Sequence, residues 1–585
     1  MHFNRRCSIL AILIVFIITG CTMERKGVPQ EVVKGELGAK LDDYLTRITP
    51  FGFSGALLVA KNGEIVINKG YGMAIKSEGI ANTSETVFST GSITKQFTAA
   101  GIMKLEMQGK LNTFDHISKY LPGVPEDKKD ITLHHLLTHT SGVINSSGPD
   151  FVEAPRDETV KKILSAPLQF SPGEQFSYSN CGYTLLAAML ERVSGKNYEE
   201  FLNEYLFKPS GMNFTGYRIP DWAKRVVAYW YSRGRDNLTP MTKPYPQWNL
   251  LGNEGILSTT ENMYKWHLAL SGDSILYRDA KKKLYTPFLN DYAYGWDVME
   301  TAHGTVIKHD GGSTLGIGAE FRRYIDADVV FILFSNRDGE EVLFNKGVRE
   351  KVETIIFGGD VPTPPLIREI EPAALERLKG TYALPSGGRF LVSVEDGSLN
   401  IEPVGQDAIS VFFFPEKKEA SLLSDLNNSS SRIFKAIIDG NYKPIQDALA
   451  EGKDPDRFVR FLRRRMQRLQ KIIGPLKEVK SVGTLPEPPE RGEGLMAVVE
   501  LKGDKGTAVF GLLWHASSII GIDLMRQSPT VTPFMLLSDT EFAGYHLGLA
   551  KNINIKFSVD ESGSVIGLTV LTKWGEVAAK KISTQ

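Results

Sequence analysis

The spacing of hydrophobic positions divides residues 37–357 into strand-like ends and a helical middle. Runs rich in β-branched and apolar residues at 53–60 and 64–67 flank Asn62-Gly63, a dipeptide typical of a tight hairpin. Helical spacing predominates from about residue 92 to residue 209. Strand-like runs return at 305–309, 317–322 and 329–334. Strands at both ends with helices between them favour an α+β fold over a βαβ array.

The pattern changes again after residue 357. Residues 358–371 are rich in glycine and proline, which predicts a linker. Short strand-like runs then indicate a small barrel or sandwich, at 380–382, 389–394, 398–402, 408–413, 542–551, 553–559 and 565–571. A helical stretch at 431–477 precedes further strands expected at 495–501, 507–514 and 519–525. We therefore expect a β-rich, barrel-like domain (372–423 and 530–585) with an inserted α+β module (424–529).

The inserted module is predicted to contain an arginine-rich amphipathic helix. Its expected apolar face consists of Phe458, Phe461, Leu462, Leu469, Ile472 and Ile473. The arginines expected largely outside that face are Arg460, Arg463, Arg464 and Arg468. A solvated polar face is the simpler interpretation of this pattern, and contact with anionic lipid is the alternative.

Length and charge narrow the class of protein. A chain of 585 residues is too long for one core and predicts two to four domains. The 68 basic residues balance the 68 acidic ones, so the charge gives no support to nucleic-acid binding. The sequence does not decide the oligomeric state.

The N-terminus has the features of a targeting segment. Arg5 and Arg6 precede an apolar run at 8–18 that is too short to span a bilayer as a stable helix. The run ends in Ile18-Thr19-Gly20-Cys21, which resembles a bacterial lipoprotein signal. The resemblance implies a signal peptide at 1–20, lipidation of Cys21, a tether at 21–36 and a periplasmic protein anchored to a membrane, with inner or outer membrane undecided. An ordinary secretory signal is the alternative.

The candidate chemistry begins at Ser92-Ile93-Thr94-Lys95, the one Ser-x-x-Lys in the chain. We expect Ser92 to cap a helix that runs to about Lys110, with Gly109 as its stop. Residues i and i+3 share a helix face, so the Ser92 hydroxyl and the Lys95 amine would lie side by side. The amine can accept the hydroxyl proton if burial lowers the lysine pKa. A capping serine followed by a solvated lysine is the alternative.

A second candidate element is Tyr178-Ser179-Asn180, on a loop before a helix expected at 184–193. The tyrosine could act as a general base if nearby cations lower its pKa. Asn180 could hydrogen-bond both Lys95 and a substrate amide. Cys181 follows, and we expect it only to begin a buried helix. A plain polar turn is the alternative for the triplet.

The third element is His309-Asp310-Gly311-Gly312, expected at the end of an edge strand. Glycines there let a substrate approach the backbone closely. The backbone N–H of Gly312, together with that of Ser92, would form an oxyanion hole. A glycine turn between two strands is the alternative.

These three elements in this order resemble the serine β-lactamase-like hydrolases. The likeness covers about 37–357 and points to the class C branch, which includes β-lactamases, D-alanyl-D-alanine carboxypeptidases, D-aminopeptidases and esterases. Flanking phrases that share it are His135-Leu136-Leu137-Thr138-His139-Thr140-Ser141-Gly142, Phe170-Ser171-Pro172-Gly173, Lys208-Pro209-Ser210-Gly211-Met212 and Gly255-Ile256-Leu257-Ser258-Thr259. The resemblance implies an antiparallel sheet flanked by helices and an acyl-enzyme mechanism without metal or organic cofactor.

By this resemblance Ser92 is the nucleophile, Lys95 and Tyr178 transfer protons, and Asn180 orients lysine and substrate. His309 and Gly311 match the ends of the third motif. The β-lactamases of the family usually have lysine where this chain has His309. Histidine is only partly charged near neutral pH, so the sequence favours an esterase, amidase or peptidase acting on a small or peptide substrate. A β-lactamase or penicillin-binding protein is the alternative, and a non-catalytic binding protein on the same fold is another.

Three further interpretations compete with these roles. His135 and His139 have the i, i+4 spacing of a metal-binding pair, but no glutamate completes a metalloprotease motif, so we expect no metal. His309 could be the base of a Ser-His-Asp triad, although Lys95 beside Ser92 makes that role redundant. Tyr294, Trp296 and Trp230 could line a cleft, with core packing as the default.

Overall fold

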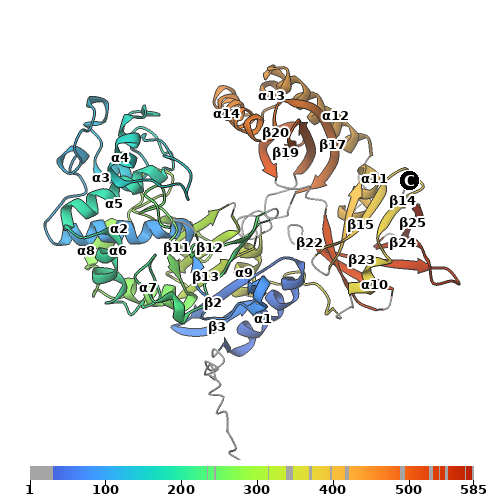
Figure 1. Cartoon of the computed structure of the whole chain (residues 1–585), viewed down its shortest axis with the longest axis horizontal. Coiled ribbons are helices and arrows are strands. Elements are labelled where there is room, and N and C mark those ends of the chain that lie inside the picture. Colours follow the sequence, from blue (N-terminus) through green and yellow to red (C-terminus); the bar gives the residue numbers. More distant parts are fainter. Residues whose placement is uncertain are drawn as a thin grey trace, which may run out of the picture.

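The computed structural model describes residues 31–582, shown in Figure 1. The internal positions outside the described residues are 233–234, 243–244, 314, 338–346, 368–371, 396–397, 415–419, 488–493, 526–530, 539, 547–550 and 574. The signal peptide and Cys21 also lie outside the described residues, so the lipid anchor stays a prediction. Among the described helices, none combines the length and the apolar character needed to cross a membrane.

The centre of the first domain is a seven-stranded antiparallel sheet. Its order is β1-β3-β2-β13-β12-β11-β10. The strands are β1 (Val32–Val33), β2 (Gly55–Lys61), β3 (Glu64–Tyr71), β10 (Asp297–Thr301), β11 (Gly304–Ser313), β12 (Ile317–Tyr324) and β13 (Val329–Ser335). β2 pairs with β13, so strands from the two ends of the domain meet at the middle of the sheet. The predicted hairpin joins β2 to β3, and Asn62 and Gly63 both have the positive φ that its tight turn requires.

Alternating side chains bury both faces of this sheet. On one face, Leu57 and Leu333 pack with helices α1 (Gly35–Ile48) and α9 (Val348–Ile356). On the other face, Leu58 and Ile332 pack with a helical layer, which lies to the left of the sheet in Figure 1. That layer comprises α2 (Thr94–Met107), α3 (Leu133–Leu137), α4 (Arg156–Ser165), α5 (Asn180–Ser194), α6 (Tyr198–Leu202), α7 (Thr260–Ser271) and α8 (Arg278–Leu284). Helices on both faces of an antiparallel sheet confirm the α+β class.

Three short two-stranded ladders accompany the main sheet. They are formed by β4 (Met73–Ile75) with β5 (Ile80–Ala81), β6 (Phe88–Ser89) with β9 (Leu257–Ser258), and β7 (Trp230–Ser232) with β8 (Arg235–Leu238). The ladder of β6 and β9 holds the chain just before Ser92 against the segment after Glu254, two stretches that are far apart in sequence.

The C-terminal region contains a closed eight-stranded barrel. Its strands are β14 (Gly380–Ala383), β15 (Arg389–Glu395), β16 (Ser398–Val404), β21 (Thr532–Leu536), β22 (Glu541–His546), β23 (Lys551–Val559), β24 (Val565–Thr572) and β25 (Gly575–Ile582). A short helix, α10 (Pro372–Glu376), precedes it. The barrel contacts the first domain, since Tyr545 packs on Phe51 with ring centroids 5.9 Å apart and donates to the carbonyl of Pro362 at 2.8 Å.

Between the two halves of the barrel the chain forms a separate α+β unit, visible at the upper right of Figure 1. Its elements are α12 (Ala420–Ile438), α13 (Lys443–Asp447), α14 (Pro455–Ile473), β17 (Leu476–Pro486), β18 (Leu495–Gly503), β19 (Gly506–His515) and β20 (Ser518–Met525), and the helix before it, α11 (Gln406–Phe413), packs in the core of the barrel. β17 to β20 form one antiparallel sheet, and α12 and α14 share its core. This confirms the expected barrel-like domain with an α+β insertion; the boundaries that we assign to each domain stay predictions.

Several expectations for this region are wrong. Residues 408–413 are helical in α11, because Ala408, Ile409, Phe412 and Phe413 recur at helical spacing and pack as one buried face. The helical stretch ends at Ile473, and β17 follows it. Of the apolar face expected on helix α14, Leu462, Leu469 and Ile473 are buried. Val459 and Met466 are buried as well, whereas Phe461 and Ile472 are 48% and 72% exposed. Phe461 and Ile472 therefore lie off the face that packs on the sheet.

Candidate active site

Ser92 lies in a single turn of 3₁₀ helix (Gly91–Ile93) directly before α2. The expected capping role is wrong, because Ile93 takes the N-cap position of α2 and makes no side-chain cap. The turn packs closely on β11. A side chain on Gly311 would place its Cβ 2.2 Å from the carbonyl oxygen of Thr90 and 2.8 Å from the nitrogen of Ser92. Glycine at 311 is therefore what allows the strand and the serine backbone to touch.

The Lys95 side chain is completely buried and has three hydrogen-bond acceptors. Its Nζ lies 3.1 Å from Oγ of Ser92, 2.7 Å from Oδ1 of Asn180 and 2.8 Å from the backbone carbonyl of Asn253. Three acceptors match the three protons of an ammonium group. The amine is thus held in one place, with the serine oxygen as one of its partners.

Burial lowers the pKa of Lys95 to about 7, and the negative charges of Glu254 and Asp310 oppose that decrease. Near neutral pH a substantial fraction of Lys95 is therefore the free amine. The condition that we set from the sequence, a lysine pKa lowered by burial, is met. This is the arrangement in which a lysine can accept a proton from a neighbouring hydroxyl.

Tyr178 lies against the same amine. Nζ of Lys95 is 4.6 Å from the centroid of its ring. Burial raises the pKa of Tyr178 well above 10, and a hydrogen bond with Ser92 only partly offsets that increase. The condition that we set from the sequence for a tyrosine base, a pKa lowered by nearby cations, is not met, because loss of hydration dominates. Tyr178 is a neutral phenol here, suited to relaying a proton rather than storing a negative charge.

Asn180 is the first residue of α5, and its position is set by the cap of that helix. The Ser179 hydroxyl accepts from the N–H of Gly182 at 3.0 Å and donates to the carbonyl of Ile144 at 2.8 Å. Cys181 is buried in the helix, and burial raises its thiol pKa to about 12, so it is inert. The Tyr-Ser-Asn segment is therefore a helix start that aims Asn180 at Lys95.

The third motif lies within β11, not after it. β10 pairs with β11 only as far as Lys308, so the stretch 309–313 pairs with β12 on one side and faces the Ser92 turn on the other. A Cβ on Gly91 would lie 3.0 Å from the nitrogen of Gly312, which places the Gly312 amide beside the serine turn. The interpretation as a glycine turn is wrong, and the edge strand expected from the sequence exists only over this stretch.

His309 is buried and its two ring nitrogens have distinct roles. Nδ1 lies 2.6 Å from the carbonyl oxygen of Asp310 and must donate to it, so Nε2 accepts from the Tyr292 hydroxyl at 3.0 Å. Burial lowers the pKa of His309 below its usual 6.5. His309 is thus a neutral imidazole, and neither nitrogen bonds Ser92, which removes the geometry of a Ser-His-Asp triad.

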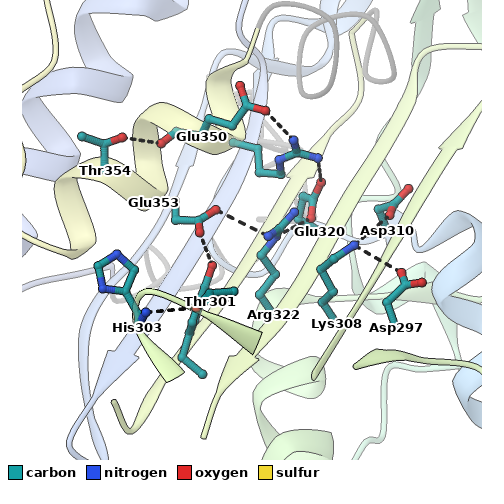
Figure 2. Close-up of polar contacts among 12 residues, drawn as sticks. Asp297, Thr301, His303, Lys308, Asp310, Glu320, Arg322, Glu350, Glu353 and Thr354 are labelled. Atoms are coloured by element: carbon teal, nitrogen blue, oxygen red, sulfur yellow. Dashed lines mark hydrogen bonds and ion pairs between the residues drawn. The ribbon is translucent and has the colours of Figure 1, made fainter. Parts of the chain in front are cut away.

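The lysine next to His309 on β11, Lys308, is paired with carboxylates. Lys308 lies between two carboxylates (Figure 2). Its Nζ is 3.2 Å from Asp297 and 4.0 Å from Asp310. Asp297 stands on β10 and Asp310 on β11, so this lysine joins the two strands where their pairing ends. Its charge is therefore matched locally, and Lys95 is the cation in contact with Ser92 among the described residues.

A buried ionic network fixes the sheet to α9 behind the site (Figure 2). Glu320 of β12 is fully buried and pairs with Arg322 at 3.0 Å and with Arg349 at 3.3 Å. Arg322 also pairs with Glu353 at 3.4 Å. A buried charge that loses its partner costs about 3–5 kcal/mol, so the network strongly favours one placement of β12, the strand that pairs with the glycine motif.

The i, i+4 interpretation of His135 and His139 is wrong. Helix α3 ends at Leu137, and His139 lies beyond it with φ of 58°, so His135 and His139 do not share a helix face. Nδ1 of His135 instead accepts from the N–H of Thr132 in a capping box. Across the described residues no group of three or more His, Cys, Asp or Glu side chains is placed to hold a metal ion.

The remaining residues are the aromatic side chains expected to pack in the core and two contacts that the sequence did not predict. Trp230, Tyr294 and Trp296 are buried, in agreement with core packing. Sequence reasoning missed Asn253, whose carbonyl holds Lys95, and Tyr292, which holds His309. Every residue type has a backbone carbonyl, so nothing in the sequence indicates that Asn253 binds Lys95. Tyr292 lies in the aromatic-rich run 292–296, which drew attention only to its other members.

The chain is similar in sequence to a known protein family. A family model described as Beta-lactamase matches residues 51–353. Penicillin-binding protein 4* of Bacillus subtilis (strain 168) is 29% identical over 426 residues, which cover 66% of this chain and 94% of that protein. A putative penicillin-binding protein, PbpX, from the same strain is 33% identical over 299 residues, covering 51% of this chain and 73% of that protein. A crystal structure of a penicillin binding protein from Bacillus halodurans covers 48% of this chain and 92% of its own, with 28% identity and a TM-score of 0.43.

Proposed function

The chain belongs to the beta-lactamase family and is a serine hydrolase, and we propose that it cleaves a carboxylic ester or amide through an acyl-enzyme on Ser92. The observation that carries this proposal is the Lys95 amine, held 3.1 Å from Oγ of Ser92 with its pKa lowered to about 7. An amine that is partly neutral at the working pH and touches a hydroxyl is a ready base.

In the acylation step the Ser92 proton passes to Lys95, and Oγ forms a bond to the carbonyl carbon. Tyr178, a neutral phenol in contact with both groups, relays the proton onward to the leaving oxygen or nitrogen as its bond to the carbonyl carbon breaks. Asn180 holds Lys95 in line through its side-chain oxygen. Water then attacks the acyl group by the reverse proton path and frees Ser92.

The charge that develops on the carbonyl oxygen needs two fixed donors. We assign them to the backbone N–H groups of Ser92 and Gly312, which the contact between Gly91 and Gly311 brings close together. Backbone donors on a strand and a helical turn are already in place before the reaction, so they need no rearrangement at the transition state. His309 supports this edge through Tyr292 and does not act on substrate protons.

A neutral imidazole at position 309 favours an uncharged substrate group at that end of the site. A free carboxylate of a β-lactam or of a D-alanine terminus would meet no matching cation from the third motif, because burial keeps His309 neutral and Lys308 is paired. We therefore propose esters and amides without a nearby carboxylate as the preferred substrates. Penicillin binding is the second candidate, favoured by the names of the two Bacillus subtilis relatives.

A substrate panel tests this preference. We expect kcat/KM for p-nitrophenyl acetate to exceed that for nitrocefin at least about 100-fold, since one matched charge is worth a factor of this order. Neutral amino-acid p-nitroanilides serve as the amide arm. In His309→Lys, which restores a cation, the ratio should fall about tenfold. Faster cleavage of nitrocefin than of every ester and anilide by the native chain would overturn the preference and support the penicillin-directed alternative.

A non-catalytic binding protein with the same fold would not react with a serine-directed probe. A fluorophosphonate probe should label the native chain and not Ser92→Ala, because only an activated serine reacts with it. A native chain that takes up no label and hydrolyses none of the panel would favour the non-catalytic role.

For localisation we propose an extracytoplasmic protein held at a bacterial membrane through Cys21, on the strength of the residues around that cysteine. More than one acyl chain on the cysteine would give stable anchoring. In a bacterial host the native chain should sediment with membranes, and Cys21→Ser should move it largely to the soluble extracytoplasmic fraction. An unchanged distribution in Cys21→Ser would contradict the lipid anchor.

A further inference from the structure

His139 is hydrogen-bonded to the residues on both sides of Tyr178. Its backbone carbonyl accepts from the N–H of Ser177 at 2.9 Å, and its ring Nδ1 accepts from the N–H of Ser179 at 3.0 Å. The two bonds come from one residue to the residues that flank the phenol in sequence. The backbone of the Tyr178 loop is therefore fixed by His139 at two successive points.

The ring of His139 also packs on the phenol itself. The ring centroids of His139 and Tyr178 are 4.2 Å apart, and that of Tyr292 is 4.6 Å from His139. Because Nδ1 is an acceptor, the ring proton is on Nε2, which is buried and has no hydrogen-bond partner in the part of the chain that the structure describes. An N–H surrounded by aromatic rings can only make weak contacts with their faces, so the ring acts by packing.

The backbone of His139 is in a sparsely populated conformation. Its φ of 58° lies in the left-handed region, which only a few per cent of non-glycine residues adopt, although asparagine, aspartate and histidine do so more often than the rest. Such a conformation persists only where the surrounding contacts determine it, and it occurs most often at functional sites. The residues after His139 are also hydrogen-bonded to the segment before Tyr178. The carbonyl of Thr140 accepts from the N–H of Gly173 and that of Gly142 accepts from the N–H of Gln169, each at 2.8 Å.

We propose that His139 is a positioning residue for the proton-transfer step, holding Tyr178 and the start of α5 at Asn180 in register with Lys95. The proposal rests on the function proposed above and assigns a role to a residue outside the reacting groups. His139 stays a neutral imidazole because it is buried and faces Lys95 and His309. Nδ1 is occupied by the Ser179 N–H, and neither nitrogen is hydrogen-bonded to Ser92 or Lys95, so we assign it no proton transfer in the reaction.

Two substitutions separate the ring from the acceptor. His139→Phe keeps an aromatic ring against Tyr178 but leaves the Ser179 N–H without its acceptor. His139→Asn offers Oδ1 where Nδ1 lies and tolerates the left-handed backbone. We expect kcat for p-nitrophenyl acetate to fall about 100-fold in His139→Phe, the cost of a misplacement of about 1 Å, with KM changed less than about threefold. His139→Asn should recover at least about a third of native kcat.

Controls distinguish positioning from folding and from proton transfer. His267→Asn, a half-buried histidine on α7 that accepts from Arg323 at 3.1 Å, should leave kcat unchanged. Circular dichroism and thermal melting identify any variant that has not folded. In both folded His139 variants the midpoint of the pH–rate profile should stay near that of the native chain, since Lys95 sets it.

The result that supports the proposal is a loss of kcat in His139→Phe that His139→Asn restores, with an unmoved pH midpoint. Native kcat in folded His139→Phe would overturn it, and so would an equal loss in folded His139→Asn. A shifted midpoint in His139→Asn would show that His139 titrates in the reaction, which also overturns it. Failure of the proposed function is distinct, because the native chain would then neither hydrolyse the ester nor take label at Ser92.

Discussion

Ser92→Ala is expected to lower kcat/KM for p-nitrophenyl acetate by at least about 10⁴-fold, the scale on which loss of a nucleophile acts. The oxyanion donors and the binding surface remain, so a small activity above the background reaction should persist. The fold should not change, because Ser92 is only half-buried and does not cap α2. Initial rates at several ester concentrations, with circular dichroism of the same sample, measure both parts.

Ser177→Ala is the matched control for this substitution. Ser177 lies on the Tyr178 loop, and its hydroxyl donates to Gln169 at 3.1 Å. We expect its kcat/KM to stay within about threefold of the native value, as for most substitutions away from reacting groups. A Ser92→Ala protein that is as active as this control would remove Ser92 from the mechanism.

The second large effect is a pH dependence set by Lys95. Its pKa is about 7, and the reactive form is the free amine, which can accept the Ser92 proton. Activity should therefore be present above this pKa and lost as pH falls through it, with kcat/KM decreasing about tenfold per pH unit on the acid side. Tyr178 has a pKa well above 10, so the profile should stay level toward about pH 9.

The same profile excludes the competing base. His309 has a pKa below 6.5, so a histidine base would place the rising limb below that value. Lys95→Arg keeps a cation but cannot accept a proton near neutral pH, and we expect it to lose about 10³-fold in kcat/KM. An acid limb centred clearly below 6.5, or native activity in Lys95→Arg, would contradict the role of Lys95.

Local pattern was sufficient for much of the first domain. Asn62-Gly63 predicts a hairpin because both turn residues accept positive φ, and the structure has it. The helix stop expected at Gly109 is also found, since α2 ends at Met107 and Gly109 has a φ of 68°. These features depend on neighbours in sequence, which is why a single sequence reveals them without comparison to its relatives.

The errors occur where tertiary contacts decide. Residues 408–413 have the composition of a strand, but burial against the barrel on one side makes them a helix. In α14 a face of exposed aromatic and aliphatic residues looks apolar in sequence, yet Phe461 is 48% exposed because the sheet packs on the adjacent face. Periodicity defines the candidate faces of a helix and leaves the choice to its neighbours.

At the candidate site the sequence predicts which residues meet, but it predicts their protonation states only in part. The spacing of Ser92 and Lys95 predicts their contact, and the structure brings Asn180 to the same amine. A role for Tyr178 as general base requires a lowered pKa, but burial raises it. Depth below the surface cannot be read from a four-residue motif. For the same reason His139 was weighed only as a metal ligand, since its contacts with Ser177 and Ser179 depend on how two distant loops pair.

The most direct test of the account is to trap the acyl-enzyme and locate it. The native chain is treated briefly with a fluorophosphonate or a slow ester, digested and mapped by mass spectrometry, with His309→Lys and Lys95→Arg treated in parallel. We predict one added group on the Ser92 hydroxyl of the native chain, formed far more slowly in Lys95→Arg. An adduct on another side chain, or rapid hydrolysis of the ester with no adduct at Ser92, would contradict the account.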